Sequence, residues 1–158
     1  NDYSLTFQDY LTSWEQCPNS VVICKHNNGN LMGYITFWPL QKGVFKLLVD
    51  GHINENQLTA DKLEPSFIHH NDTYWYIGSF VFLERSFLMR SFLSKALMAA
   101  FGDLDYETGV HLCASAYTPD GRAVADKIPL KRSVHKDPLG YPVYELSSTV
   151  KTLVQRYT

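Results

Sequence analysis

The sequence has few cysteines and no long apolar run. Cys17, Cys24 and Cys113 stand at spacings that fit neither a zinc ribbon nor a disulfide framework, which favours free thiols in a reducing cytoplasm. No apolar stretch approaches the roughly 20 residues that span a bilayer. The chain opens with polar Asn1 and Asp2, so we expect no signal peptide. These features predict a soluble cytoplasmic protein.

An excess of basic charge is also missing. The formal net charge is −2, and the pairs Arg85 with Arg90 and Lys131 with Arg132 form only weak basic clusters. Nucleic-acid binding needs a concentrated basic face, so we do not expect it. The adjacent histidines at 69–70 point in opposite directions on an extended loop, and no Cys or carboxylate stands at ligand spacing. We therefore expect no metal.

Apolar residues make up 45% of the 158-residue chain, enough for one globular domain over residues 1–158. Periodicity and turn residues predict helices at 7–14, in pieces over 41–63, at 88–101, at 122–128, and at the C-terminus after a cap at Ser148. Strands are predicted from 21, at 31–38 (ended by Pro39), at 74–83, at 110–117 and at 142–146. The almost continuously apolar run 74–83 is typical of a central strand buried on both faces. The chain belongs to the α/β class.

Three stretches carry a resemblance to a known family: MGYITFWPL (32–40), YWYIGSFVFLERSFLMRSFLSKALMAAF (74–101) and VHLCASAYTPDGRAVADKIPL (110–130). They resemble the hairpin strand, the central strand with its pyrophosphate loop and helix, and the next strand with its short helix in GNAT N-acetyltransferases. The resemblance implies an α/β (α+β) fold. Its central sheet would be mixed and mostly antiparallel, would contain a splayed pair of parallel strands and would be flanked by helices. The resemblance also implies that the domain binds acetyl-CoA.

The resemblance also implies where acetyl-CoA would lie. Backbone groups at the end of the central strand would bind the pantetheine and the thioester, and the pyrophosphate would lie at the amino end of the following helix. Asp120 falls where an Asn often contacts the cofactor, although its simplest role is a helix N-cap. The family loop reads Arg/Gln-x-x-Gly-x-Gly/Ala, whereas this chain has Ser91 and Leu93 at the small positions. The predicted cofactor-binding residues are Val81, Phe82, Leu83, Arg85, Leu88, Arg90, Ser91, Phe92, Leu93 and Asp120.

Acyl transfer needs a group that takes the proton of the amine and an acid that protonates the departing thiolate. The predicted base is Glu84, at the end of the central strand, with Glu55 and Glu64 as weaker candidates. The short helix carries no tyrosine, so Tyr117, just before the turn, is the predicted acid; its alternative role is a ring in the core or at its rim.

We hypothesise an acetyl-CoA-dependent N-acetyltransferase that acts on an amine of a small molecule or a peptide. The alternative is an inactive GNAT-like binding or dimerisation module, its splay sealed by Phe87, Leu88 and Phe92. A third possibility is an α/β structural domain without a coenzyme site. The sequence leaves open whether the chain forms a homodimer.

Overall fold

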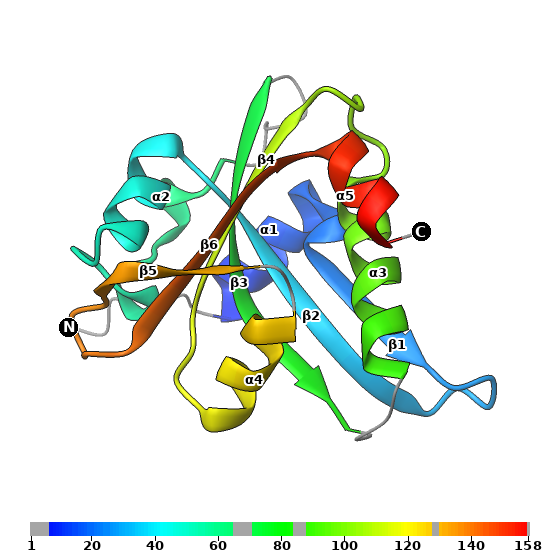
Figure 1. Cartoon of the computed structure of the whole chain (residues 1–158). Coiled ribbons are helices and arrows are strands. Elements are labelled where there is room, and N and C mark those ends of the chain that lie inside the picture. Colours follow the sequence, from blue (N-terminus) through cyan, green and yellow to red (C-terminus); the bar gives the residue numbers. More distant parts are fainter. Residues whose placement is uncertain (1–6, 65–70, 84–87, 128–129, 158) are drawn as a thin grey trace.

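The computed structural model describes residues 7–64, 71–83, 88–127 and 130–157, which form a twisted six-stranded sheet with helices on both faces (Figure 1). The strands are β1 (Val21–Lys25), β2 (Leu31–Leu40), β3 (Asp72–Phe82), β4 (Gly109–Ser115), β5 (Lys131–Lys136) and β6 (Pro142–Thr149). The helices are α1 (Phe7–Gln16), α2 (Lys42–Val49), α3 (Leu88–Phe101), α4 (Pro119–Lys127) and α5 (Val150–Tyr157). Within the described ranges, none of these helices is long and apolar enough to cross a membrane.

The strand order is β1-β2-β3-β4-β6-β5. Among the described strands, β3 and β4 form a parallel pair and all other neighbours are antiparallel. A parallel connection needs a crossover, and α3 supplies it between β3 and β4. The predicted mixed, mostly antiparallel sheet with one parallel pair is therefore confirmed.

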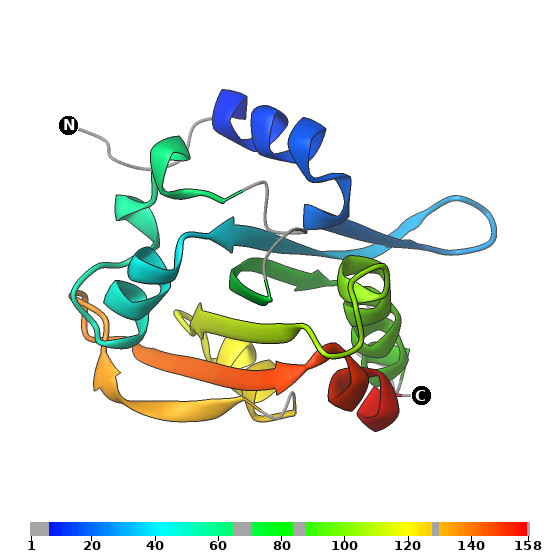
Figure 2. The same ribbon diagram turned by 90° about the horizontal axis from the view of Figure 1, so that it is seen from above.

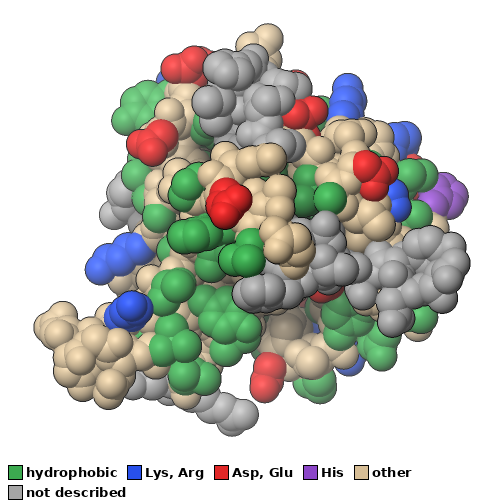
Figure 3. Space-filling view, turned by 180° about the vertical axis from the view of Figure 1, so that it is seen from behind, with side chains coloured by type: hydrophobic (Ala, Val, Ile, Leu, Met, Phe, Trp, Pro, Cys, Tyr) green, Lys and Arg blue, Asp and Glu red, His purple; other side chains and the backbone are tan. Residues whose placement is uncertain are grey.

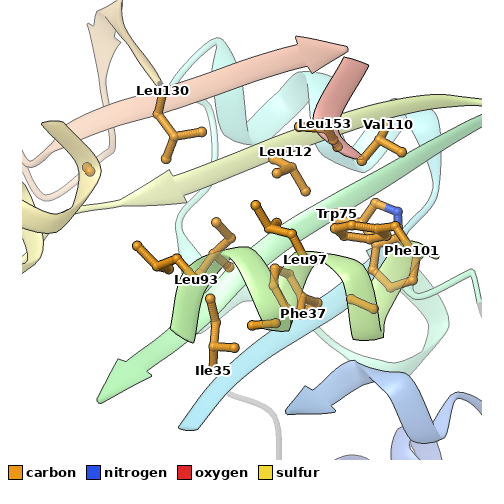
Figure 4. Close-up of a cluster of buried hydrophobic side chains, with 14 of the residues drawn as sticks. Ile35, Phe37, Trp75, Leu93, Leu97, Phe101, Val110, Leu112, Leu130 and Leu153 are labelled. Carbon is orange, nitrogen blue, oxygen red and sulfur yellow. The ribbon is translucent and has the colours of Figure 1, made fainter. Parts of the chain in front are cut away.

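Two apolar cores lie on the two faces of the sheet. On one face, α3 and α5 cover the strands (Figure 2), and Figure 4 shows Leu93 and Leu97 of α3 pointing toward the strand residues. The ring of Phe101 makes edge contacts with Trp75 at 5.1 Å and Phe37 at 5.3 Å between centroids. Large side chains buried this fully contribute roughly 1.5–3 kcal/mol each. On the other face, α2 covers a second core that includes Trp38, Leu48 and Tyr76.

The boundaries of several elements differ from the sequence predictions. Pro39 does not end its strand, because β2 runs to Leu40. Strand β1 does not reach this part of β2, where residues 62–64 lie along the edge instead: Pro39 O accepts from Glu64 N at 2.9 Å, and Leu40 forms an isolated bridge with Leu63. The side of Pro39 that lacks an N–H therefore faces a short loop contact rather than a strand ladder. The segment 55–63 forms two short 3₁₀ turns, η2 (Glu55–Gln57) and η3 (Ala60–Lys62), rather than a helix. The last helix is capped by Thr149, whose Oγ1 accepts from Thr152 N at 3.2 Å, and not by Ser148.

Strand β5 was not predicted at all. It is the edge strand beside β6, and most of its side chains are exposed and polar. An edge strand with both faces in solvent shows no apolar alternation, so its sequence resembles a loop.

Candidate functional site

The central feature of the site is a gap between the two parallel strands. Pairing of β3 with β4 runs from Asp72 with Gly109 to Tyr76 with Cys113, and no further pair follows. Both strands nevertheless continue, β3 to Phe82 and β4 to Ser115. Beyond Tyr76 the two strands therefore splay apart. The prediction that β3 is buried on both faces is wrong for this outer half, whose residues from Gly78 to Phe82 are only half-buried.

A β-bulge at Gly78 lies at the start of the splay. Thr36 of β2 pairs with Ser79, but Phe37 pairs with Ile77, so Gly78 is the extra residue of β3. A Cβ atom on Gly78 would lie 2.2 Å from Nε1 of Trp38. The bulge bends β3 where it leaves β4, and only glycine lets the indole ring approach this closely.

A cavity of about 170 Å³ opens between the splayed strands and α4. Small residues from all three elements line it, among them Gly78, Ala114, Ala116 and Gly121. Tyr117 closes one side. The cavity lies where β3, β4 and the start of α4 meet. This is the position at which the resemblance implies that the thioester would lie.

The backbone of β3 presents two amide groups to this gap. Leu83 N donates to Met32 O at 2.8 Å, so the backbone of Leu83 faces β2. Antiparallel pairs alternate between hydrogen-bonded and non-bonded positions, so Val81 also faces β2, whereas the amides of Phe80 and Phe82 face the splay. Of the predicted residues 81–83, only Phe82 therefore presents its backbone to the gap, and Phe80 was missed.

Helix α3 begins at Leu88, so the predicted loop residues 88–93 are helical. The amide groups of its first turn lie outside the helical hydrogen-bond ladder, and helix N-termini of this kind favour anions. Ser91 is exposed, whereas Phe92 and Leu93 are buried in the core and Phe92 stacks on Phe82 at 5.5 Å between ring centroids. The bulky Leu93 thus lies in the apolar core rather than at the surface. The predicted residues Glu84 and Arg85, and the side chains of Leu88 and Arg90, lie outside the described residues.

The cap of α4 differs from the prediction. Thr118 Oγ1 accepts from Gly121 N at 3.0 Å, so Thr118 rather than Asp120 is the N-cap residue. Asp120 lies exposed in the first turn of α4, where a negative charge favours the helix dipole.

Three polar side chains, Glu55, Tyr76 and Tyr117, lie beside the last paired residues of the splayed strands. Tyr76 Oη donates to Glu55 Oε2 at 3.0 Å. Asn54 holds Glu55 in place through a capping box, because its side chain accepts from Asn56 N and Gln57 Oε1 accepts from Asn54 N. The Tyr117 hydroxyl oxygen is buried nearby and has no hydrogen-bond partner among the described residues.

Burial controls the protonation of this group. It raises the pKa of Glu55, and the hydrogen bond from Tyr76 offsets part of the rise. It also raises the pKa of Tyr76 well above the ordinary value, and the neighbouring Glu55 charge adds to the effect. The pKa of Tyr117 is raised by burial, while the nearby hydroxyl of Tyr76 acts in the opposite direction. The two phenols therefore keep their protons at neutral pH, and Glu55 is the group able to accept one.

The residue Glu55 was considered from the sequence only as a weaker base, and Tyr76 was not considered. Glu55 and Glu64 both fall in the segment expected to cover the acceptor pocket, and no local pattern separates them. The Asn54-x-x-Gln57 capping box was the one signal that marked Glu55 as part of an ordered turn.

A second polar row crosses β3, β4 and β6 on the same face of the sheet. His111 lies 2.8 Å from Ser147 Oγ through Nδ1 and 3.3 Å from Asp72 Oδ1 through Nε2, and its ring stacks on Tyr74. Within the described part of the chain, no three His, Cys, Asp or Glu side chains stand together as metal ligands would. All three cysteines are free thiols.

The sequence matches no protein-family model, and a comparison with curated protein sequences finds no match. The fold, in contrast, is similar to solved structures. Naa20 from Chaetomium thermophilum, solved with a bisubstrate analogue, superposes with a TM-score of 0.51 at 14% identity, over 99% of this chain and 80% of that one. A variant of the spermidine N-acetyltransferase SpeG from Vibrio cholerae gives 0.50 at 11% identity, over 97% and 80%. Together with the strand order and the splayed parallel pair, these similarities show that the chain has the GNAT N-acetyltransferase fold.

Proposed function

We propose that the protein is an acetyl-CoA-dependent N-acetyltransferase that moves an acetyl group to an amine of a small molecule or a peptide. The observation that supports this most directly is the end of β3–β4 pairing at Tyr76 and Cys113, with a cavity in the gap beyond. Fold alone does not establish activity. The proposal rests on the polar groups that converge at this gap.

The described residues fit an acetyl-CoA thioester. The glycine and alanine residues of the cavity leave room for a narrow pantetheine arm, and the amides of Phe80 and Phe82 face it. The first turn of α3 offers amide groups to a diphosphate, as helix N-termini do. Arg85, Arg90 and Ser91 remain proposed contacts for that diphosphate, and Asp120 for the rest of the coenzyme.

The proposed chemistry is direct attack of a neutral amine on the thioester carbonyl. The N–C bond forms as the C–S bond breaks, and the proton of the amine passes to a carboxylate. Glu55 suits this role because it is a half-buried carboxylate that already accepts a hydrogen bond from Tyr76 at the mouth of the splay. Glu84 remains the second proposed base. Tyr117, with a raised pKa and an unpartnered hydroxyl, is the proposed donor to the departing thiolate.

A thermal-shift titration with acetyl-CoA tests the proposal. At a ligand concentration about 100 times Kd, binding to the native state adds about 2.7 kcal/mol, which raises the Tm of a domain of this size by about 5–10 °C. The variant Gly121→Trp, which fills the cavity, should lose the shift, whereas Lys151→Ala on α5 should keep it. An unchanged Tm of the parent protein up to millimolar acetyl-CoA would rule out the proposed acetyl-CoA-dependent activity.

One observation favours the alternative of a binding or dimerisation module. Strand β1 is the end strand of the described sheet, and Ile23 and Leu31 of its hairpin expose 55% and 46% of their surface. From behind, hydrophobic side chains gather on one part of the surface (Figure 3). An exposed apolar edge strand is a pairing surface for a second copy. A dimer in sedimentation together with no response to acetyl-CoA would favour this module.

A further inference from the structure

A second, larger cavity lies on the face of the sheet that α2 covers. It is a groove of about 560 Å³ between α2 and the edge strand β5, and Figures 1 and 2 show the end of β5 beside α2. Ser133 Oγ donates to Val49 O at 3.3 Å and ties the two walls together. We refer to it as the α2–β5 groove. Its lining residues are Lys42, Phe45, Lys46, Val49, Asp50, Tyr74, Lys131, Arg132, Ser133, Val134, His135 and Glu145.

The walls of the α2–β5 groove are basic although the whole chain is acidic. Its lining contains four Lys or Arg side chains and only two carboxylates, whereas the whole chain carries a net charge of −2. Lys46 is paired with Asp50 at 2.8 Å. Lys42, Lys131 and Arg132 are exposed and form no ion pair with any described residue. Lys42 also stands in the first turn of α2, where a positive charge opposes the helix dipole, so it is not placed there to stabilise the helix.

An irregularity of β5 shapes one wall of the groove. Arg132 pairs with Tyr144 and Lys136 with Pro142, so three residues of β5, 133–135, stand against the single residue Val143 of β6. Such a bulge twists a strand away from its partner. The bulged residues line the groove, whose floor includes Phe45 and Tyr74 in ring contact at 5.3 Å.

The groove ends close to the proposed reaction centre. Tyr74, in its floor, precedes Tyr76 by two residues on the same face of β3, which is about 7 Å along a strand. Glu145 pairs with Cys113, which pairs with Tyr76, so it lies two strands away, at about 10 Å. A ligand that extends from the groove past Tyr74 by about 7 Å would reach Tyr76 and its partner Glu55 with an amine, while its remaining groups contact Lys42, Lys131 and Arg132.

We propose that the α2–β5 groove selects an amine acceptor that carries carboxylates, in the form of an acidic peptide with a free amine. This inference rests on the proposed acetyltransferase function and names its substrate class. The α2 wall from Lys42 to Asp50 is about 12 Å long, which matches three to four extended residues rather than one amino acid. Carboxylates of such a peptide would neutralise the unpaired cations.

The test measures peptide binding by fluorescence anisotropy, with and without saturating coenzyme A. The probe is a peptide with a free N-terminal amine, Asp and Glu in its first four positions and a dye at its C-terminus. The matched peptide has Asn and Gln at those positions. We expect the acidic peptide to bind at least about tenfold more tightly. Its carboxylates would be attracted by Lys42, Lys131 and Arg132 at short range, whereas the Asn and Gln side chains of the matched peptide carry no charge.

Two variants with equal changes in charge locate the effect. Lys131→Glu combined with Arg132→Glu should abolish the preference, whereas Lys151→Glu combined with Arg156→Glu, on α5, should keep it. The single variant Lys42→Glu tests the other wall without touching the sheet. Competition by free L-glutamate as strong as that by the peptide would overturn the assignment of a peptide and identify a small anionic acceptor instead.

Equal binding of the two peptides, or equal losses in the β5 and α5 variants, would overturn the inference. Its failure is separate from a failure of the proposed function, because the latter shows as a missing thermal shift with acetyl-CoA in the parent protein. A rise in Tm with acetyl-CoA together with equal binding of the two peptides would support the proposed acetyltransferase function. It would overturn only the assignment of an acidic peptide as the acceptor.

Discussion

At the scale of single residues, the position of Glu55 is energetically unfavourable for a charged carboxylate. Burial disfavours its charged form, and the hydrogen bond from Tyr76 compensates only in part. Glutamine could accept the same hydrogen bond from Tyr76 through its amide oxygen without a charge that burial disfavours. Glu55 therefore makes two predictions possible, one about stability and one about turnover.

The stability of the protein should depend on pH through Glu55. The pKa of Glu55 is raised in the folded state above its value of about 4.3 in an unfolded chain, so the folded state binds more protons between these two values. The free energy of unfolding should fall as the pH rises through this interval. Urea unfolding between pH 4 and 7 should show this loss in the parent protein and not in Glu55→Gln. Glu15→Gln, on the exposed surface of α1, should behave as the parent does.

The same substitution tests the proposed proton path if the enzyme turns over. Glu55→Gln should lower kcat by about 10²-fold or more, a typical contribution of a general base, and remove the acid limb of the pH profile. A comparable loss in Glu84→Gln with unchanged kinetics in Glu55→Gln would transfer the role to Glu84.

At the scale of elements, the bulge in β3 makes Gly78 a structural requirement. Gly78→Ala would place its Cβ 2.2 Å from Trp38 Nε1 and force the indole ring or the strand to move. We expect a loss of about 1–3 kcal/mol in urea unfolding, typical of overpacking. Gly43→Ala is the matched control, because nothing lies within 4 Å of its Cβ position in α2 and alanine favours a helix by about 0.5–1 kcal/mol. Similar stabilities of the two variants would show that the bulge is not constrained by the indole.

The elements that the sequence predicted well are those with an apolar periodicity. The stripe Phe92, Leu93, Ala96, Leu97 predicted α3 because all four side chains are buried in one core. Strand β5 has no such pattern, since it lies at the edge of the sheet. The 3₁₀ turns at 55–62 were read as helix because short turns share the spacing of a helix over a few residues.

The site was less predictable than the fold, for a physical reason. Which amides of β3 face the splay depends on the register with β2, and a bulge at Gly78 shifts that register by one residue. The prediction therefore included Val81 and Leu83, which face β2, and missed Phe80. Glu55 and Tyr76 meet across 21 positions of sequence, a contact that no local pattern encodes.

At the scale of the whole molecule, the sheet consists of two halves, β1–β3 and β4–β6, joined by the short parallel pairing of Asp72–Tyr76 with Gly109–Cys113. The amides of Phe80 and Phe82 face the splay and have no strand partner there, so they should exchange hydrogen faster than the amides of 72–76, which lie between two paired strands. Because acetyl-CoA would bridge the halves, it should slow exchange at 77–82 and at 114–121. The β1–β2 turn at 27–30, on the far side of β2, should be unaffected. Protection of β1 that grows with protein concentration, without any change at the splay, would instead indicate a dimer that pairs through this edge strand.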